Sequence, residues 1–149
     1  MGAGFRTSIE GQISEVARVA ATFDAFATEH GVPAEVRRSL QVVLDDLLAN
    51  VVLHGLAGRA GGRAEVDVAL AGEALTVTIS DNGPPFDPFA QAAPDTTLSI
   101  EDRQIGGLGI HLVRQMMDEV SYERRGEWNV TVLTKRLSDR TPHQNSGEE

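Results

Sequence analysis

The chain has 149 residues, with 13 Lys and Arg against 22 Asp and Glu, and a formal net charge of −9. Because its basic residues form no dense patch and cluster at most in isolated pairs, nucleic acid is an unsuitable partner, since that binding depends on cation–phosphate contacts. The absence of cysteine excludes disulfides, thiolate nucleophiles and zinc–thiolate sites. With no signal-peptide pattern and no apolar run of membrane-spanning length, we expect a cytoplasmic domain with no membrane partner.

The first third of the chain predicts a short strand followed by two helices. Alternation of apolar and polar residues over 5–9 predicts the strand. Apolar residues at helical spacing predict a helix over 12–30, with Gly31 as its C-terminal stop. Pro33 is typical of the first turn of a second helix, which we expect to continue to about Gly55.

The second helix carries polar residues at the edge of its apolar face. At 100° per residue, six apolar side chains form one arc, namely Val36, Leu40, Val43, Leu44, Leu47 and Val51. Asn50 falls at the edge of this arc and Asp46 just beyond it, one turn earlier, whereas Asp45 points to solvent. Burying such groups without a partner is unfavourable, so their position beside an apolar face must be explained by an interaction. A capping or inter-element hydrogen bond is one reason, and a metal and water site beside a cleft is another.

The middle of the chain predicts a β-hairpin and then a long irregular segment. After a glycine-rich loop over 57–63, alternation on either side of a turn at Gly72 predicts two strands with one buried face. Asp81 ends the second strand and begins the sequence Asp-Asn-Gly-Pro-Pro, in which the prolines exclude an immediate return strand. The segment 84–105 is long for a loop in a compact domain, which is typical of a lid over a ligand.

The last third of the chain opens with a glycine cluster at 106, 107 and 109, followed by apolar positions that fit a helix. Glycines at the start of a helix let backbone N–H groups approach an anion, and the helix dipole favours that charge. A flexible loop before a core helix is the alternative. A closing hairpin that turns near Gly126 completes one domain over 1–137, and the polar segment 138–149 is expected to be a disordered tail.

Taken in order, these motif blocks resemble the ATPase superfamily of gyrase, heat-shock chaperone, histidine kinase and MutL proteins. The blocks are the helix with Asp46 and Asn50, the strand ending in Asp81-Asn82-Gly83, and the Gly107-Leu108-Gly109 turn after the lid. The stretch 105–118 and the sequence Pro85-Phe86-Asp87-Pro88 are similar to the anti-sigma-factor serine kinases of bacterial partner-switching systems. The resemblance implies an α+β fold, a two-layer α/β sandwich of Bergerat type. Three helices would cover a mixed, mostly antiparallel sheet, with ATP between the helices and the lid.

The resemblance also implies roles for individual residues. Asn50 would bind the Mg²⁺ that bridges the phosphates, for which a neutral oxygen is a suitable ligand. Asp81 would accept a hydrogen bond from the exocyclic amine of adenine, and Gly83 would leave room for the base. The remaining nucleotide-binding positions are the phosphate-wrapping turn of Gly107, Leu108 and Gly109, and Thr131 behind the adenine. The charge distribution adds Arg103, the only lysine or arginine between Arg63 and Arg114, as a phosphate contact.

Three further side chains receive structural interpretations. His54 falls near the centre of the apolar arc of the second helix, so we expect it to be packed and hydrogen-bonded. His111 and Arg114, on the helix that the glycines open, are expected to face the surface or a partner protein.

Asp46 departs from the family pattern, which usually has Glu at this position as the general base. Asp offers the same chemistry but is shorter by about 1.5 Å, one carbon–carbon bond. General-base assistance is typically worth about 10²–10⁴-fold in rate and depends on hydrogen-bond reach. We therefore expect nucleotide binding to survive and phosphoryl transfer to be slow.

The resemblance implies a regulatory serine/threonine kinase that binds Mg·ATP, holds a sigma factor or similar client, and phosphorylates a small antagonist protein. It also suggests a homodimer. Asp46 leaves open a second function, a nucleotide-dependent protein-binding module with little or no phosphotransfer. The catalytic half of a histidine kinase is disfavoured, because no helical hairpin with a phosphoacceptor histidine precedes Asp46. A structural or scaffold protein is also disfavoured, because it would not need a long lid segment.

Overall fold

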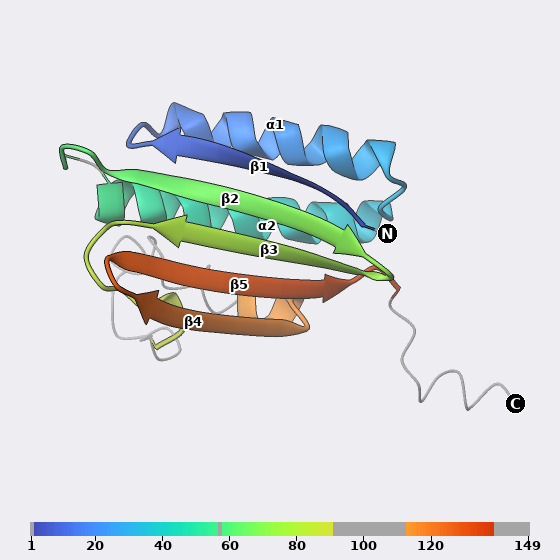
Figure 1. Ribbon diagram of the computed structural model, residues 1–149. Coiled ribbons are helices and arrows are strands. Elements are labelled where there is room, and N and C mark those ends of the chain that lie inside the picture. The colour runs from blue at the N-terminus through green and yellow to red at the C-terminus, as the bar shows by residue number, and fades with distance from the viewer. Residues whose placement is uncertain (1, 57, 91–112, 139–149) are drawn as a thin grey trace, which may run out of the picture.

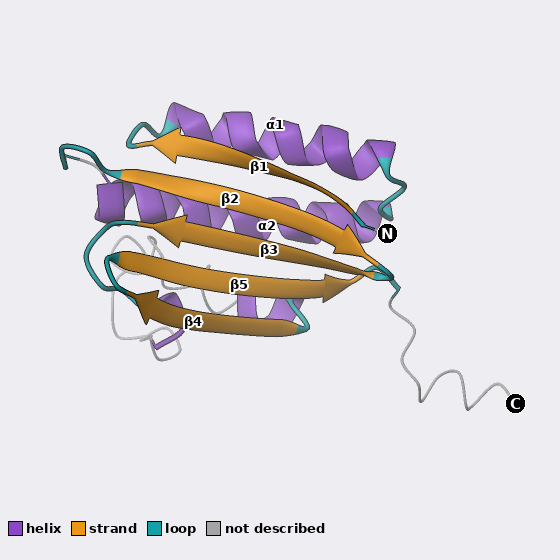
Figure 2. Ribbon diagram, in the orientation of Figure 1, coloured by secondary structure: helices purple, strands orange, loops and turns teal. Residues whose placement is uncertain are grey.

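A computed structural model of the chain describes residues 2–56, 58–90 and 113–138. Within these ranges, five strands form one sheet and two long helices lie against one of its faces (Figures 1 and 2). The elements are β1 Ala3–Glu10, α1 Ser14–Glu29, α2 Ala34–Asn50, the π-helical turn η1 Val51–Leu56, β2 Arg63–Ala71, β3 Ala74–Asp81, the 3₁₀ turn η2 Pro88–Ala90, β4 Glu119–Arg125 and β5 Trp128–Arg136. This is the predicted two-layer α/β sandwich.

The strand order in the sheet is β1-β2-β3-β5-β4, and all four pairings between described strands are antiparallel. The expectation of a mixed sheet is therefore wrong for the described strands. Two of the pairings are tight hairpins, β2–β3 and β4–β5, which can join only antiparallel strands. Gly72 (φ 62°) and Gly126 (φ 59°) sit in their turns, where a positive φ matches the twist of the strands.

The junction between the two helices follows from its sequence. Gly31 has a φ of 72°, the left-handed conformation that ends many helices. The Val32 N–H donates to the Ala27 carbonyl at 2.9 Å and the Gly31 N–H to the Thr28 carbonyl at 3.3 Å, which satisfies carbonyls at the end of α1. Pro33 (φ −56°, ψ 145°) then precedes the first residue of α2 and directs the chain back along the sheet.

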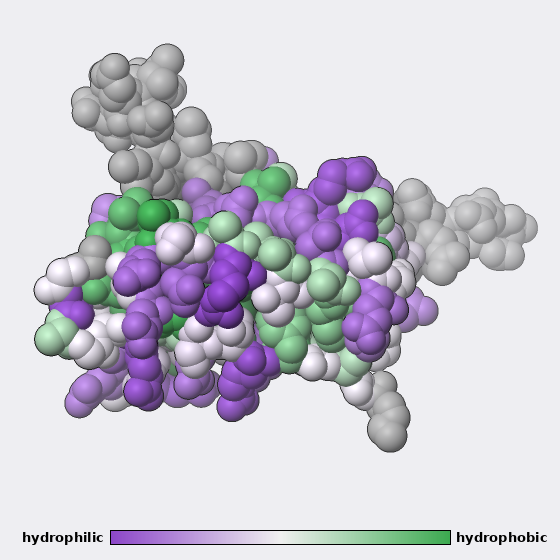
Figure 3. Space-filling model, turned by 90° about the horizontal axis from the view of Figure 1, so that it is seen from above, coloured by the Kyte–Doolittle hydropathy of each residue, from purple (hydrophilic) through white to green (hydrophobic). Residues whose placement is uncertain are grey.

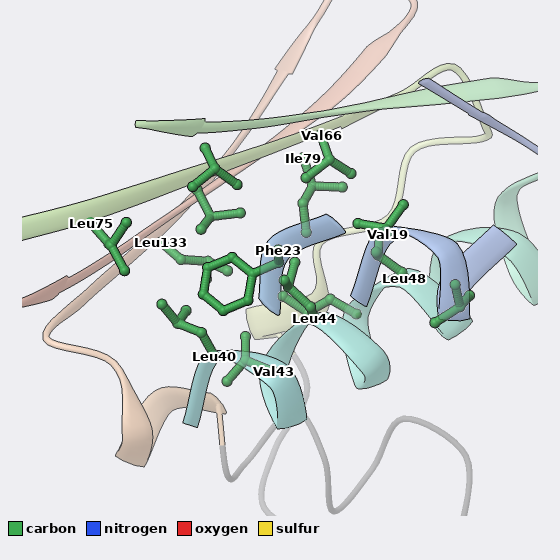
Figure 4. Close-up of a cluster of buried hydrophobic side chains, with 14 of the residues drawn as sticks. Val19, Phe23, Leu40, Val43, Leu44, Leu48, Val66, Leu75, Ile79 and Leu133 are labelled. Atoms are coloured by element: carbon green, nitrogen blue, oxygen red, sulfur yellow. The ribbon is translucent and has the colours of Figure 1, made fainter. Parts of the chain in front are cut away.

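The core lies between the two helices and the sheet. Figure 4 shows the ring of Phe23 in the middle of this cluster, between side chains of the sheet and of α2. Fully or almost fully buried members include Val19 and Phe23 of α1, Leu40, Val43, Leu44 and Leu48 of α2, and Val66, Leu75, Ile79 and Leu133 of the sheet. Each strand of the β2–β3 hairpin buries every second residue, as the alternation predicts.

The end of the second helix differs from an ideal α-helix. From Val51 the chain continues as the π-helical turn η1, which has more residues per turn and so changes the phase of the side chains. Val52 and Leu56 are buried in consequence, whereas His54 is exposed. The expectation of a packed His54 is therefore wrong, because it assumed 100° per residue throughout.

By length and composition alone, the continuous helix Ala34–Leu56 could cross a membrane, which differs from the expectation that no such run is present. In this fold, however, its apolar face packs against α1 and the sheet, as in the core helix of a globular protein. Seen from the side of α1 and β1, the surface carries hydrophilic residues with small hydrophobic patches between them (Figure 3).

The two faces of α2 should respond differently to truncation. Leu44 is fully buried, so Leu44→Ala should lower the free energy of unfolding by about 2–5 kcal/mol through lost burial and a residual cavity. Val42 lies on the same helix but is 47% exposed, so Val42→Ala should change it by no more than about 0.5 kcal/mol. Urea denaturation of both variants measures the difference, and equal effects would contradict this packing.

Candidate functional site

A cleft lies where the end of α2, η1, the end of β3 and the start of β5 meet. Figure 1 shows these ends at the same side of the molecule, although they are distant in sequence. The cleft has a volume of about 170 Å³ and is partly open to solvent. Because small-molecule sites usually measure about 300–1,000 Å³, the described residues form only part of such a site. The described residues that line it are Leu47, Asn50, Val51, His54, Gly55, Ile79, Asp81, Pro84, Pro85, Phe86, Pro88, Asn129 and Thr131.

The buried polar side chains of the described residues converge on this cleft. Four polar or charged side chains are buried there: Asn50, Asp81, Asn129 and Thr131, which are 6%, 7%, 3% and 7% exposed. Buried polar groups are unfavourable unless they are paired, so their concentration at one place indicates a binding site. Three of the four are residues that the sequence predicts as nucleotide-binding.

Asn50, which lines the cleft, and Asp46, which lies one helical turn earlier on α2 and does not line it, each carry a buried polar atom without a partner. Neither Asn50 Nδ2 nor Asp46 Oδ2 has a hydrogen-bond partner within the described part of the chain. The alternative of a capping or inter-element hydrogen bond therefore does not account for these two atoms. Burial raises the pKa of the half-buried Asp46 carboxyl. The neighbouring Asp45 side chain is exposed, as predicted, although partial burial raises the pKa of its carboxyl too.

The described residues offer too few oxygen atoms near Asn50 to hold a divalent cation alone, so the cation would also need oxygen atoms from a bound ligand. In the described ranges, no group of three or more His, Asp or Glu side chains is placed to hold a metal ion. Mg²⁺ normally binds one or two protein oxygens and takes its remaining ligands from phosphates and water. A single amide beside this cleft suits that mode of binding.

Asp81 is held through one of its two carboxylate oxygens. Oδ1 accepts hydrogen bonds from the Gly83 N–H at 2.9 Å and from Asn129 Nδ2 at 3.0 Å. Within the described residues, no hydrogen bond to Oδ2 is present. The carboxylate is thus fixed on one side and has an acceptor available for a ligand on the other.

Gly83 is required by a contact between two parts of the backbone. A Cβ atom at Gly83 would lie 2.8 Å from both the Cα and the carbonyl oxygen of Gly55 in η1. Such a distance is closer than packed atoms approach, so only glycine fits. From the sequence, we expect glycine at position 83 because it leaves space for a bound base. The structure gives a different reason, which is the close approach of η1 to the loop after β3.

The sequence analysis did not identify Asn129, the most buried of the four polar side chains. Its amide contacts Asp81, the carbonyl of Pro84, and the Phe86 N–H. Strand alternation was the available signal for its burial, because Asn129 lies on the inward face of β5 together with Thr131 and Leu133. These three partners, however, lie more than forty residues away in sequence.

The other predicted residues fall into two groups. Arg103, Gly107, Leu108, Gly109 and His111 lie outside the described residues. Arg114 is exposed, as expected, but its guanidinium donates a hydrogen bond to the Phe89 carbonyl and lies 5.5 Å from the centre of the Phe89 ring. Arg114 thereby connects the helical turn 113–116 to η2. His54 lies at the cleft, although its side chain is exposed.

Comparison with known proteins places this cleft in a family context. Residues 9–135 match the family model described as a histidine kinase-like ATPase domain. The serine/threonine-protein kinase BtrW of Bordetella bronchiseptica is 32% identical over 101 residues, which cover 68% of this chain and 71% of BtrW. The serine-protein kinase RsbW of Listeria monocytogenes is 27% identical over 130 residues, covering 84% of this chain and 82% of RsbW. The anti-sigma F factor of Bacillus subtilis is 25% identical over 100 residues, covering 66% and 68%.

Among solved structures, the RsbU and RsbW domains of Rv1364c from Mycobacterium tuberculosis are similar, with a TM-score of 0.67 and 18% identity. The similarity covers 93% of this chain and 34% of that chain and shows that the fold is shared. The family match extends from β1 into β5 and so includes every described element that lines the cleft. The chain belongs to the histidine kinase-like ATPase domain family.

Proposed function

We propose that this chain is an ATP-dependent protein serine/threonine kinase that regulates a sigma factor or a similar client by partner switching. It phosphorylates a small antagonist protein and thereby controls which partner the client binds. The similarity to two serine kinases and an anti-sigma factor supports this proposal. The observation that carries it is the cleft that collects the buried polar side chains, with an unpartnered carboxylate oxygen of Asp46 one helical turn before Asn50. The protein acts in the cytoplasm, as a homodimer.

The base of ATP occupies the part of the cleft near Asp81. The acceptor Oδ2 receives a hydrogen bond from the exocyclic amine of adenine. Apolar walls contributed by Val51, Ile79 and Pro85 cover the faces of the ring, which is the usual composition of a small-molecule pocket. Thr131 supplies a hydroxyl behind the base.

The triphosphate lies toward the end of α2, where Asn50 supplies an oxygen ligand for Mg²⁺. The ion supplies charge neutralisation of the phosphates when it is bound. The predicted contacts of Arg103, Gly107, Leu108 and Gly109 with the phosphates remain part of the proposal. Because phosphoryl transfer needs positioning and electrostatic stabilisation more than covalent chemistry, these few groups suffice.

Asp46 acts as the general base for the transfer. The serine or threonine hydroxyl oxygen of the antagonist bonds to the γ-phosphorus while the bond to the bridging oxygen breaks, and ADP leaves. The hydroxyl proton moves to the Asp46 carboxylate, whose Oδ2 has no competing partner within the described residues. A pKa raised by burial makes this carboxylate a better proton acceptor than an ordinary aspartate.

Incubation of the purified protein with labelled ATP, Mg²⁺ and its cognate antagonist tests the kinase proposal. Asp46→Asn should lower the transfer rate by about 10²–10⁴-fold while ATP affinity stays within about threefold, because the base is lost and the adenine contacts remain. Asp45→Asn, on the exposed side of α2, is the matched control. ATP binding without any transfer by the unmodified protein would reject the kinase and favour the nucleotide-dependent binding module.

A second experiment tests the assignment of the adenine contact. Asp81→Asn removes the charge from the acceptor and should weaken ATP binding by about 10- to 100-fold, the usual value of a hydrogen bond to a charged group. Asp45→Asn should leave the affinity unchanged because that side chain is exposed, away from the cleft. Isothermal titration calorimetry with Mg²⁺ measures both, and equal effects of the two substitutions would overturn the assigned pocket.

The raised pKa of Asp46 also predicts a stability effect that depends on pH. The folded-state pKa of Asp46 lies above its unfolded-state pKa, so the charged carboxylate lowers the free energy of unfolding. This penalty is absent at low pH, where the carboxyl is protonated in both states, and it appears as the pH rises through the folded-state pKa. Asp46→Asn should therefore raise the midpoint of urea unfolding at pH 7 and leave it unchanged at a pH below 3.8, the ordinary value for aspartate. A destabilised Asp46→Asn protein at pH 7 would contradict the burial cause.

A further inference from the structure

We propose that Asn129 is a positioning residue that sets the preference of the cleft for a 6-amino purine over a 6-oxo purine. It does so by holding Asp81 in one orientation, so that the remaining carboxylate oxygen meets the ligand at a fixed point. This inference rests on the proposed binding of ATP, and it concerns a residue that the nucleotide does not need to touch.

The amide nitrogen of Asn129 fixes Asp81 from behind. Nδ2 donates to Asp81 Oδ1 at 3.0 Å and to the Pro84 carbonyl at 2.9 Å. The Gly83 N–H donates to the same Oδ1 at 2.9 Å. Two donors on one oxygen oppose rotation of the carboxylate, and because a carboxylate carries acceptors and no donor, its other oxygen accepts from the ligand.

The amide oxygen of Asn129 is held equally firmly. It accepts hydrogen bonds from the Tyr122 hydroxyl, from the Phe86 N–H at 3.2 Å and from Arg124 Nη1 at 3.3 Å. Because three donors surround this oxygen, the nitrogen must face the acceptors, and the orientation of the amide follows from its partners. Tyr122 thereby supports the orientation of Asp81 through Asn129.

The same side chain also positions one wall of the cleft. Pro84 and Phe86 line the cleft, and Asn129 binds the carbonyl of the first and the N–H of the second. Arg124 adds a hydrogen bond to the Gly83 carbonyl at 2.8 Å. The segment that follows Asp81 and the carboxylate of Asp81 are therefore held by one buried amide.

A fixed acceptor discriminates between purines by position. A 6-amino purine presents an N–H donor at its exocyclic group, whereas a 6-oxo purine presents an oxygen there and an N–H at the neighbouring ring nitrogen. A carboxylate that is free to turn would accept from either, but one held by Asn129 meets the exocyclic position and faces an oxygen in the 6-oxo ligand. Specificity of this kind comes from the unfavourable pairing as much as from the favourable one.

The test compares ATP with inosine triphosphate, whose base is a 6-oxo purine, by calorimetry on the full chain. The unmodified protein should prefer ATP by about 10- to 100-fold. Asn129→Asp places an acceptor against Asp81 Oδ1 and should reduce this preference to about threefold or less. Tyr122→Phe, which removes one donor to the amide, should reduce it part of the way. Asn82→Ala is the matched control, because that amide bonds Arg63 and Gly61 and does not line the cleft.

The ratio of the two dissociation constants separates positioning from a purely structural role. A general loss of folded protein lowers both affinities by the same factor, so an unchanged ratio in Asn129→Asp would overturn the inference. If circular dichroism shows that Asn129→Asp is unfolded, Tyr122→Phe decides, and an unchanged ratio there overturns it too. A change of the ratio in Asn82→Ala as large as in Tyr122→Phe would also overturn it. Absence of ATP binding by the unmodified protein would instead reject the proposed function, and this inference with it.

Discussion

The backbones of Gly55 and Gly83 lie in contact, and the geometry of the cleft depends on that contact. Gly55 belongs to the π-helical turn after Asn50, and Gly83 follows Asp81 by two residues. A side chain at Gly83 would push the helix end away from the loop, because its Cβ would lie 2.8 Å from the Gly55 backbone. The contact therefore sets the spacing between the wall that carries Asn50 and the wall that carries Asp81.

Asp46 shows how function and stability oppose each other in this fold. A buried carboxylate oxygen without a partner weakens the free protein, and the raised pKa is the thermodynamic expression of that penalty. The remainder of α2 compensates, because the adjoining side of the helix buries a continuous apolar face in the core. The packing of the helix thus offsets the penalty of a buried carboxylate that is useful only when a ligand is present.

The sequence predicted the elements whose signals are local. Helical spacing and strand alternation identified both helices and all five described strands. The family resemblance, and not the periodicity, grouped Asn50, Asp81 and Thr131, which all line the cleft. What local patterns missed depends on tertiary contacts. The π-helical turn that exposes His54 has no periodicity of its own in so short a segment. Asn129 is recognisable only from partners that alternation does not reveal, and the all-antiparallel arrangement of the described strands follows from long-range pairing.

The hydrogen bond between Asp81 and Asn129 joins residues that are 48 positions apart. The two hairpins form from neighbouring residues, but pairing β3 with β5 closes a long loop, and its entropy is lost before the contacts form. Completing the cleft therefore requires this long-range pairing, which hairpin formation alone does not supply. A nascent chain whose β5 is still inside the ribosomal exit tunnel lacks Asn129 and Thr131, two of the four buried polar side chains of the cleft.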